Sequence, residues 1–164
     1  MKKEIILVRH GKAADHNNYK RDIDRVLTER GVGDGYKIGE KLIKEGITPD
    51  LILTSPAARA NHTALIIARV MKFEEDKLKF VNRLYHCSAD TFLDEIYALP
   101  EDISSVMMVA HNPGVTDLAY ELTRGGTTFL PTTGVAVIRF NGVTWKDIGS
   151  AKAIDSLIIK PKEL

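Results

Sequence analysis

The chain has 164 residues, a formal net charge of +1, and apolar and charged residues at 44% and 27% of its length. These values suit one soluble globular domain over residues 1–164, and they provide no global field that would attract nucleic acid or a membrane surface. Because Cys87 is the only cysteine, a disulfide framework is excluded and a cysteine-based zinc site is not expected.

A short apolar run at Ile5–Val8 predicts a buried parallel strand. The run is too short for the core of a signal peptide, and no other run is long enough to span a bilayer, so we expect a cytoplasmic protein. Arg9-His10-Gly11 follows at the carboxyl end of the strand, where open α/β sheets build their sites. These residues supply a guanidinium fork for phosphate, a nucleophile or base, and room for close backbone approach.

Short apolar runs then alternate with helical patterns, which predicts an α/β fold: three layers, with a mainly parallel sheet flanked by helices. The expected strands are residues 5–8, 51–54, 78–81, 106–110 and 134–140. The expected helices run from a Thr28 cap to about Glu45, from Ser55-Pro56 to about Met71, from a Ser88 cap to about Leu99, and from Asn112-Pro113 to about Thr123.

The last part of the chain carries a hairpin signal. Asn141-Gly142 is typical of a type I′ turn, so we expect Val143–Ile148 to return as a strand. Trp145 follows this signal and is expected to pack in the core rather than to stack on a base. Leu157–Ile159 could add an edge strand.

Polar clusters follow three of the expected strands. They are Arg9-His10-Gly11, Ser55-Pro56-Ala57-Ala58-Arg59 and His111-Asn112-Pro113-Gly114. Because the carboxyl ends of parallel strands lie on the same edge of a sheet, two histidines and two arginines should converge there. Arginine clamps phosphate oxygens, and histidine can attack phosphorus or stabilise the charge that develops. The sequence therefore predicts a pocket for a phosphoryl group.

These residues resemble the histidine phosphatase superfamily, which has a phosphoglycerate mutase-like fold. The resemblance covers nearly the whole chain and is carried by Arg9-His10-Gly11, Ser55-Pro56, Arg59, Thr63 and His111. The short length and the segment Arg25-Val26-Leu27-Thr28 are similar to the SixA-type phosphohistidine phosphatase branch, which lacks the large insertions that cap small-molecule sites. The resemblance implies that His10 is the transiently phosphorylated nucleophile and that Arg9, Arg59 and His111 complete the phosphate pocket, joined by Arg25.

The implied mechanism sets a protonation state for each histidine. His10 must be neutral on its attacking nitrogen, so its other ring nitrogen should donate to a backbone carbonyl. Arg9, Arg59 and a protonated His111 should hold the equatorial oxygens, after which water hydrolyses the phosphohistidine. We expect no metal and no cofactor, because the cationic side chains would do the electrostatic work of a metal.

The general acid is where this chain departs from many members of the family. His86 stands where a glutamate or aspartate is common, and Asp90 lies one turn further on. An alkoxide leaving group needs a proton, whereas an imidazole leaves phosphohistidine with weak assistance. The pattern therefore favours a P–N substrate or slow turnover of esters, with His86 as a candidate acid. The alternatives are Asp90, no acid at all, and a merely structural His86 at the pocket rim.

Two other motifs do not favour a different chemistry. Cys87 lacks an arginine six residues further on, so it is not a cysteine-phosphatase loop. Asp22-Ile23-Asp24 is similar to an aspartate-nucleophile motif, but no apolar strand precedes it.

The expected function is a metal-independent phosphatase acting on phosphohistidine in a protein. One alternative is a small-molecule phosphatase of the same superfamily acting on phosphomonoesters, and another is a non-catalytic phosphate-binding module. The expected partner is thus a phosphorylated protein or a small phosphomonoester, and no oligomeric state is indicated.

Overall fold

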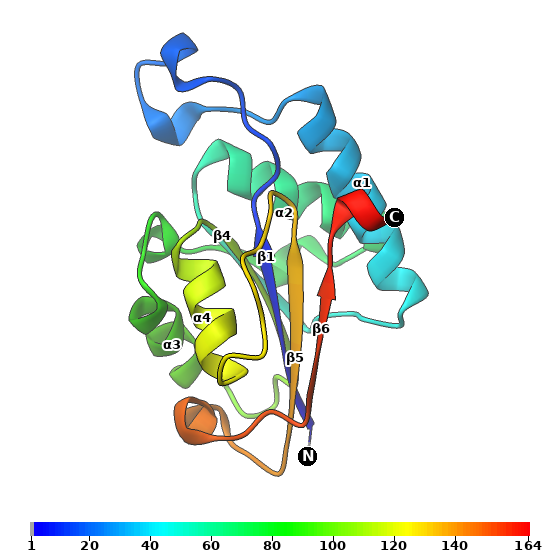
Figure 1. The fold of residues 1–164 in the computed structure, drawn as a ribbon, viewed down its shortest axis with the longest axis vertical. Helices are drawn as coiled ribbons and strands as arrows, with labels where there is room; N and C mark the ends of the chain where they lie inside the picture. The colour runs from blue at the N-terminus through cyan, green and yellow to red at the C-terminus, as the bar shows by residue number, and fades with distance from the viewer. Residues whose placement is uncertain (1) are drawn as a thin grey trace.

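The computed structural model describes residues 2–164 and is built on a six-stranded sheet in the order β3-β2-β4-β1-β5-β6 (Figure 1). The strands are β1 Lys2–Arg9, β2 Leu51–Thr54, β3 Leu78–Phe80, β4 Ser105–Ala110, β5 Val135–Asn141 and β6 Asp155–Ile159. Strands β1 to β4 pair in parallel, whereas β5 pairs antiparallel with both β1 and β6. The predicted α/β fold with a mainly parallel sheet is confirmed.

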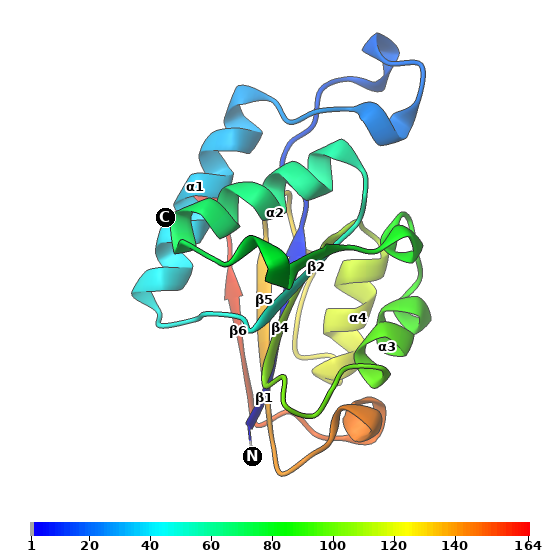
Figure 2. The same cartoon turned by 180° about the vertical axis from the view of Figure 1, so that it is seen from behind.

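Two pairs of helices cover the two faces of the sheet (Figures 1 and 2). They are α1 Glu29–Lys44 and α2 Ala58–Met71 on one face, and α3 Ala89–Tyr97 and α4 Gly114–Leu122 on the other. Alternate side chains of β1 serve the two layers: Ile6 and Val8 pack with α1 and α2, and Ile5 and Leu7 with α3 and α4. Burial on both faces explains why β1 and β4 read as continuous apolar runs.

Short 3-10 helices complete the secondary structure. They are η1 His16–Asn18, η2 Asp22–Asp24, η3 Glu75–Lys77, η4 Asn82–Leu84, η5 Trp145–Ser150 and η6 Pro161–Glu163. Along residues 2–164, no helix combines the length and the apolar character needed to cross a membrane.

The predicted helix starts are confirmed in part. Thr28 caps α1, because its side chain accepts a hydrogen bond from the Gly31 N–H. Ser55 does not cap α2, which begins at Ala58. The Ser55 N–H still donates to the carbonyl of Val109 in β4, so this residue belongs to the sheet edge and its hydroxyl is directed into the site.

The start of α4 is likewise shifted relative to the prediction. Pro113 is the residue before the helix, which begins at Gly114. The Asn112 side chain accepts a hydrogen bond from the Thr116 hydroxyl at 2.7 Å and a longer one from the Thr116 N–H at 3.3 Å. Asn112 therefore stabilises the first turn from the strand side of the junction.

The predicted hairpin is wrong. A type I′ turn needs positive φ at both central residues, but only Gly142 has it, and Asn141 is still part of β5. The chain instead enters η5, where Trp145 is fully buried and its indole N–H donates to the Ile103 carbonyl at 2.7 Å. Burial of this side chain draws the segment across the base of the α3–α4 layer, and β6 returns later beside β5. The packing role of Trp145 and the edge strand at Leu157–Ile159 are confirmed.

An arm formed by residues 12–28 projects beyond the carboxyl edge of the sheet and carries η1 and η2 (Figures 1 and 2). Backbone hydrogen bonds tie its base together, from Ala14 to Val26 and from Thr28 to Lys12. The arm thereby brings Asp22 of η2, and Arg25 directly after it, close to Arg59 at the start of α2.

Candidate functional site

His10 lies at the carboxyl end of β1 and is held by its backbone. Its N–H donates to the Ala110 carbonyl of β4 at 3.0 Å, and its carbonyl accepts from the Thr133 N–H at 3.1 Å. The ring Nδ1 lies 2.7 Å from the Gly11 carbonyl oxygen. Because a carbonyl only accepts, Nδ1 carries the hydrogen and Nε2 is the free base.

The protonation state of His10 agrees with this tautomer. Burial and, to a lesser extent, the nearby guanidinium groups of Arg59, Arg9 and Arg25 together lower the pKa of His10 to about 4, against the opposing effect of the bond to Gly11. His10 is therefore neutral near pH 7. The expected neutral ring with a carbonyl-bound Nδ1 is confirmed.

Gly11 and Thr63 connect β1 to α2. The Gly11 N–H donates to the Thr63 hydroxyl at 3.0 Å, and that hydroxyl donates to the Arg59 carbonyl at 2.7 Å. A side chain on Gly11 would come within 3.1 Å of the Gly31 carbonyl and of the Thr133 hydroxyl, so only glycine fits without displacing its neighbours. The turn after His10 is thus tied to the helix that carries Arg59.

His111 faces His10 from the end of β4, with 5.2 Å between the ring centroids. It is 2% exposed, and its Nε2 lies 2.8 Å from the Ser55 hydroxyl, which itself accepts from the Ala57 N–H. The Ser55 hydroxyl hydrogen is therefore available for Nε2, which leaves the ring hydrogen of His111 on Nδ1. Within residues 2–164 this buried Nδ1 has no hydrogen-bond partner.

The expected protonated state of His111 is wrong for the free site. Burial lowers the pKa of His111 to about 2, and the neighbouring His10 and Arg59 act in the same direction. The neutral ring can still donate one hydrogen bond through Nδ1. His111 therefore offers a hydrogen bond to an oxyanion rather than a full positive charge.

Arg9 is fixed on the side of the site away from the arm. Its Nη1 donates to the Leu130 carbonyl at 3.1 Å, and the Phe129 ring centroid lies 5.4 Å from its guanidinium carbon. Asn112 donates to the same Leu130 carbonyl at 2.9 Å. The Nε of Arg9 is buried and has no partner among the described residues, so it is an available donor.

Arg59 and Arg25 meet on one carboxylate, that of Asp22 in η2. Arg59 is 2% exposed and donates to the Asp22 carbonyl and to its Oδ2, both at 2.8 Å. Arg25 donates through Nη1 to Asp22 Oδ1 at 3.0 Å and through Nε to the Ala14 carbonyl at 2.8 Å. The structure thus brings Arg25 to the site, as the resemblance implies.

Asp22 has two further partners on the segment between β3 and α3. The Tyr85 hydroxyl donates to Oδ2 at 2.7 Å, and the His86 Nε2 lies 3.0 Å from the same oxygen. Partial burial would raise the pKa of Asp22, but the hydrogen bonds from Tyr85, His86, Arg59 and Arg25 together hold it well below its usual range. Asp22 is therefore ionised at any working pH.

His86 lies at the rim of the pocket, and Asp90 does not reach it. The His86 side chain is 51% exposed, and its ring centroid lies 4.6 Å from that of His111. Asp90 is exposed on α3 and, within residues 2–164, makes no hydrogen bond or ion pair with the site. Of the two acid candidates, only His86 is in place.

Sequence reasoning missed Asp22 and Tyr85 as members of the site. The sequence presents Asp22 only as part of a motif similar to that of aspartate nucleophiles, which lacks a preceding strand. The available signal was the spacing of Asp22 and Arg25, which allows an i,i+3 ion pair in a 3-10 turn. Nothing in the local pattern around Tyr85 marks it.

Comparison with known proteins places this geometry in a family. The model of the histidine phosphatase superfamily (branch 1) matches residues 5–85. The solved structure of SixA from Agrobacterium tumefaciens, named as a candidate phosphohistidine phosphatase, is 30% identical, with a TM-score of 0.78 over 94% of this chain and 97% of its own. The chain belongs to the histidine phosphatase superfamily, in its SixA-type branch.

Two further SixA structures share the fold. The candidate phosphohistidine phosphatase SixA from Nakamurella multipartitia is 25% identical, with a TM-score of 0.84 over 98% of this chain and 97% of its own. A protein histidine phosphatase SixA complexed with tungstate is 22% identical, with a TM-score of 0.82 over 98% of each chain. As a member of the SixA-type branch, this chain is a phosphatase with a histidine nucleophile.

Proposed function

We propose that this SixA-type phosphatase removes phosphoryl groups from phosphohistidine in proteins, with His10 as its nucleophile. The observation that carries the proposal is the state of Asp22. It is the carboxylate bonded within the pocket, and its four donors keep it ionised. An ionised carboxylate cannot protonate an alkoxide, so the site suits a leaving group that departs with little help.

In the first chemical step, a bond forms between His10 Nε2 and phosphorus while the bond from phosphorus to the substrate imidazole breaks. The electron pair leaves with the imidazole nitrogen, which then takes a proton. Water attacks phosphorus in the second step, which releases phosphate and restores His10. Nδ1 of His10 stays bonded to the Gly11 carbonyl throughout and keeps the ring oriented.

The charge of the pocket matches a phosphoryl dianion. Arg9, Arg25 and Arg59 contribute three positive charges and Asp22 contributes one negative charge, so these four residues together with the neutral His10 and His111 carry a net charge of two positive. Arg9 Nε and His111 Nδ1 are buried donors without partners among residues 2–164, and both can bind phosphoryl oxygens. Tungstate, a phosphate-like oxyanion, is bound by one SixA relative.

We assign His86 the role of assisting the leaving imidazole. It is half exposed and can exchange protons with water, while Asp22 fixes its Nε2 at 3.0 Å. Its ring lies against His111 and beside Tyr85, at the exposed rim of the pocket. Weak assistance from this position suffices for a P–N bond.

The test compares a phosphohistidine protein with an alkyl phosphomonoester, glycerol 2-phosphate, in buffer containing a metal chelator. We expect kcat/KM to be at least about a hundredfold higher for the phosphohistidine protein, because the ionised Asp22 cannot protonate the departing alkoxide and His86 assists it only weakly. Comparable or faster turnover of the ester would instead support a small-molecule phosphatase. Absence of turnover of both substrates would exclude the proposed activity.

A further inference from the structure

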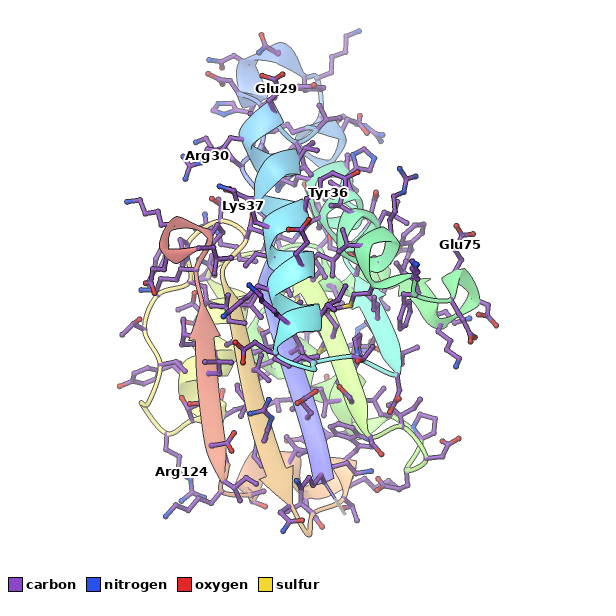
Figure 3. The ribbon with its side chains drawn as sticks, turned by 90° about the vertical axis from the view of Figure 1, so that its right-hand side faces the viewer. Glu29, Arg30, Tyr36, Lys37, Glu75 and Arg124 are labelled. Atoms are coloured by element: carbon purple, nitrogen blue, oxygen red, sulfur yellow. The ribbon has the colours of Figure 1, made fainter. Side chains whose placement is uncertain are left out.

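A second cleft, of about 380 Å³, lies beside the phosphate pocket. Its walls come from the first turn of α1, from the segment 129–132 that follows α4, and from η6 close to the C-terminus. Figure 1 shows η6 next to α1, and Figure 3 shows Arg30 projecting from the start of α1 on the side where η6 lies. Its volume is within the range of ligand-binding sites.

The cleft and the phosphate pocket share one wall. Phe129 lines the cleft, is 63% exposed, and lies with its ring 5.4 Å from the guanidinium carbon of Arg9. The next residue, Leu130, accepts the hydrogen bond from Arg9 Nη1. A substrate whose phosphoryl group contacts Arg9 therefore brings its neighbouring groups next to Phe129 and the mouth of the cleft.

The charged side chains that line the cleft are cationic. Arg30 lies 3.6 Å from Asp34, and Lys160 lies 4.0 Å from Glu163, both at the long end of ion-pair distances. Lys162 makes no ion pair within residues 2–164. Pro131 and Pro161 line the same cleft and have no backbone N–H, so an anion there would bind to the cationic side chains.

Most of the residues that line the cleft lie outside the segment matched by the superfamily model. The superfamily model matches residues 5–85, which includes Arg30, whereas the other lining residues follow position 128.

We propose that this cleft binds carboxylate side chains that flank the phosphohistidine of the protein substrate. The inference rests on the proposed function and adds a preference for acidic surroundings of the phosphorylated residue. Rim cations contribute modestly to affinity, but they favour acidic partners and fix the orientation of docking. Phe129 supplies apolar contact between the two sites.

Direct binding separates this proposal from catalysis. Two peptides carry a stable phosphonate analogue of phosphohistidine, one with glutamates and one with glutamines at the neighbouring positions, and their Kd values are measured by calorimetry. For the wild type we expect the glutamate peptide to bind about fivefold more tightly, which corresponds to two exposed ion pairs. In the double variant Lys160→Ala/Lys162→Ala this preference should disappear.

A matched control removes the same charge elsewhere. Lys77 and Lys79 lie at η3 and β3, on the opposite edge of the sheet from β6. The variant Lys77→Ala/Lys79→Ala should keep the preference, because it changes net charge but not the cleft. The variant Glu163→Gln should strengthen the preference, because it removes the carboxylate that lies near Lys160.

The remaining outcomes each overturn the proposal. The proposal fails if the wild type shows no preference for the glutamate peptide or if the preference survives in the cleft variant. It also fails if both double variants lose the preference equally, because the cleft would then not bind the acidic residues specifically. If the cleft variant instead raises KM only for small bisphosphates, the site serves a second anionic group of a small molecule. Turnover of the corresponding phosphohistidine peptide by the wild type is scored separately, so failure of the proposed function is distinguishable from failure of the cleft.

Discussion

The phosphate pocket is built from two halves that differ in how they are held. The strand-end half consists of Arg9, His10, Ser55 and His111, and the loop half consists of Asp22, Arg25, Tyr85 and His86. His111 is 2% exposed and Ser55 fully buried, whereas the side chains of Asp22 and His86 are 37% and 51% exposed. Backbone ladders fix the first half, and side-chain bonds to one carboxylate fix the second.

Arg59 joins the two halves. Its carbonyl is connected through Thr63 to the Gly11 N–H next to His10, and its guanidinium group is bonded to Asp22. The rigid half therefore provides the nucleophile, whose geometry is the same for any substrate. In the function that we propose, the more exposed half adjusts charge and proton supply, which depend on the leaving group.

The largest expected effect comes from the strand-end half. The variant His10→Ala should lower kcat/KM on a phosphohistidine protein by about a thousandfold or more, because no phosphoenzyme can form. Trapping of radioactive phosphate on the protein should disappear with it. His62, an exposed histidine on α2, provides the matched control, and His62→Ala should leave both measurements unchanged.

Trapped phosphate on the His10→Ala protein would contradict the assignment of the nucleophile. Loss of activity in the His62→Ala control would instead indicate damage to α2. Circular dichroism of both variants separates these cases from unfolding.

The second expected effect is on the pH profile, which tests the burial of the strand-end half. Because the pKa of His10 is lowered to about 4, its Nε2 is a free base down to that pH. The acid limb of the kcat/KM profile should therefore end near pH 4, with no further rise between there and neutrality, since this quantity reports the free enzyme. With an ordinary histidine pKa near 6.5, activity at pH 5 would be only about 3% of the plateau. Activity that still rises with pH through about 6.5 would contradict the buried, neutral nucleophile.

The same lowered pKa values affect stability, which must be measured beside activity. The unfolded chain binds protons at His10 and His111 below about pH 6.5, while the folded chain binds them only at about 4 and about 2. The free energy of unfolding should thus decrease as the pH falls below 6.5, and it should continue to fall toward the lower pKa. Chemical denaturation at each pH shows whether the activity measured there belongs to folded protein.

The two halves also differ in how far the sequence could predict them. His10 and His111 each follow an apolar run directly, so recognising the strands was enough to place both rings on one edge. Asp22 and Tyr85 are 63 positions apart and sit in irregular segments, so no periodicity relates them. Only the family resemblance predicts that Arg25 belongs to the site.

The protonation of His111 and the missed hairpin show a further limit. Whether a strand-end histidine carries a proton depends on how completely its neighbours exclude water, and this is a property of packing. The local preference of Asn141-Gly142 for a tight turn was overruled by burial of Trp145, a gain that comes from distant contacts. Local sequence patterns predict the structure correctly only where few long-range contacts compete with them.

A third prediction concerns the charge of the loop half. The variant Asp22→Asn preserves the shape of the side chain and raises the net charge of the pocket from two to three positive. Vanadate or phosphate should then bind about tenfold more tightly, while kcat falls because product phosphate leaves more slowly. Inhibition constants for vanadate and the rate of phosphate release provide the measurements. Weaker binding of vanadate would show that Asp22 mainly holds Arg25 and Arg59 in place.

The smallest expected effect distinguishes the leaving groups. The variant His86→Ala should lower kcat on glycerol 2-phosphate and on phosphohistidine protein by unequal factors, because an imidazole needs less proton assistance than an alkoxide leaving group. We expect a loss of about tenfold for the ester and about threefold or less for the P–N substrate. His86→Gln is the matched variant, because it can keep a hydrogen bond to Asp22 without serving as an acid.

If His86 acts by proton transfer, the glutamine variant should lose as much ester activity as the alanine variant. If His86 only orients Asp22 and Arg59, the glutamine variant should restore activity on both substrates. Equal, negligible losses on both substrates would remove His86 from the mechanism. The loop half would then contribute charge alone, and proton supply to the leaving imidazole would come from solvent at the open rim.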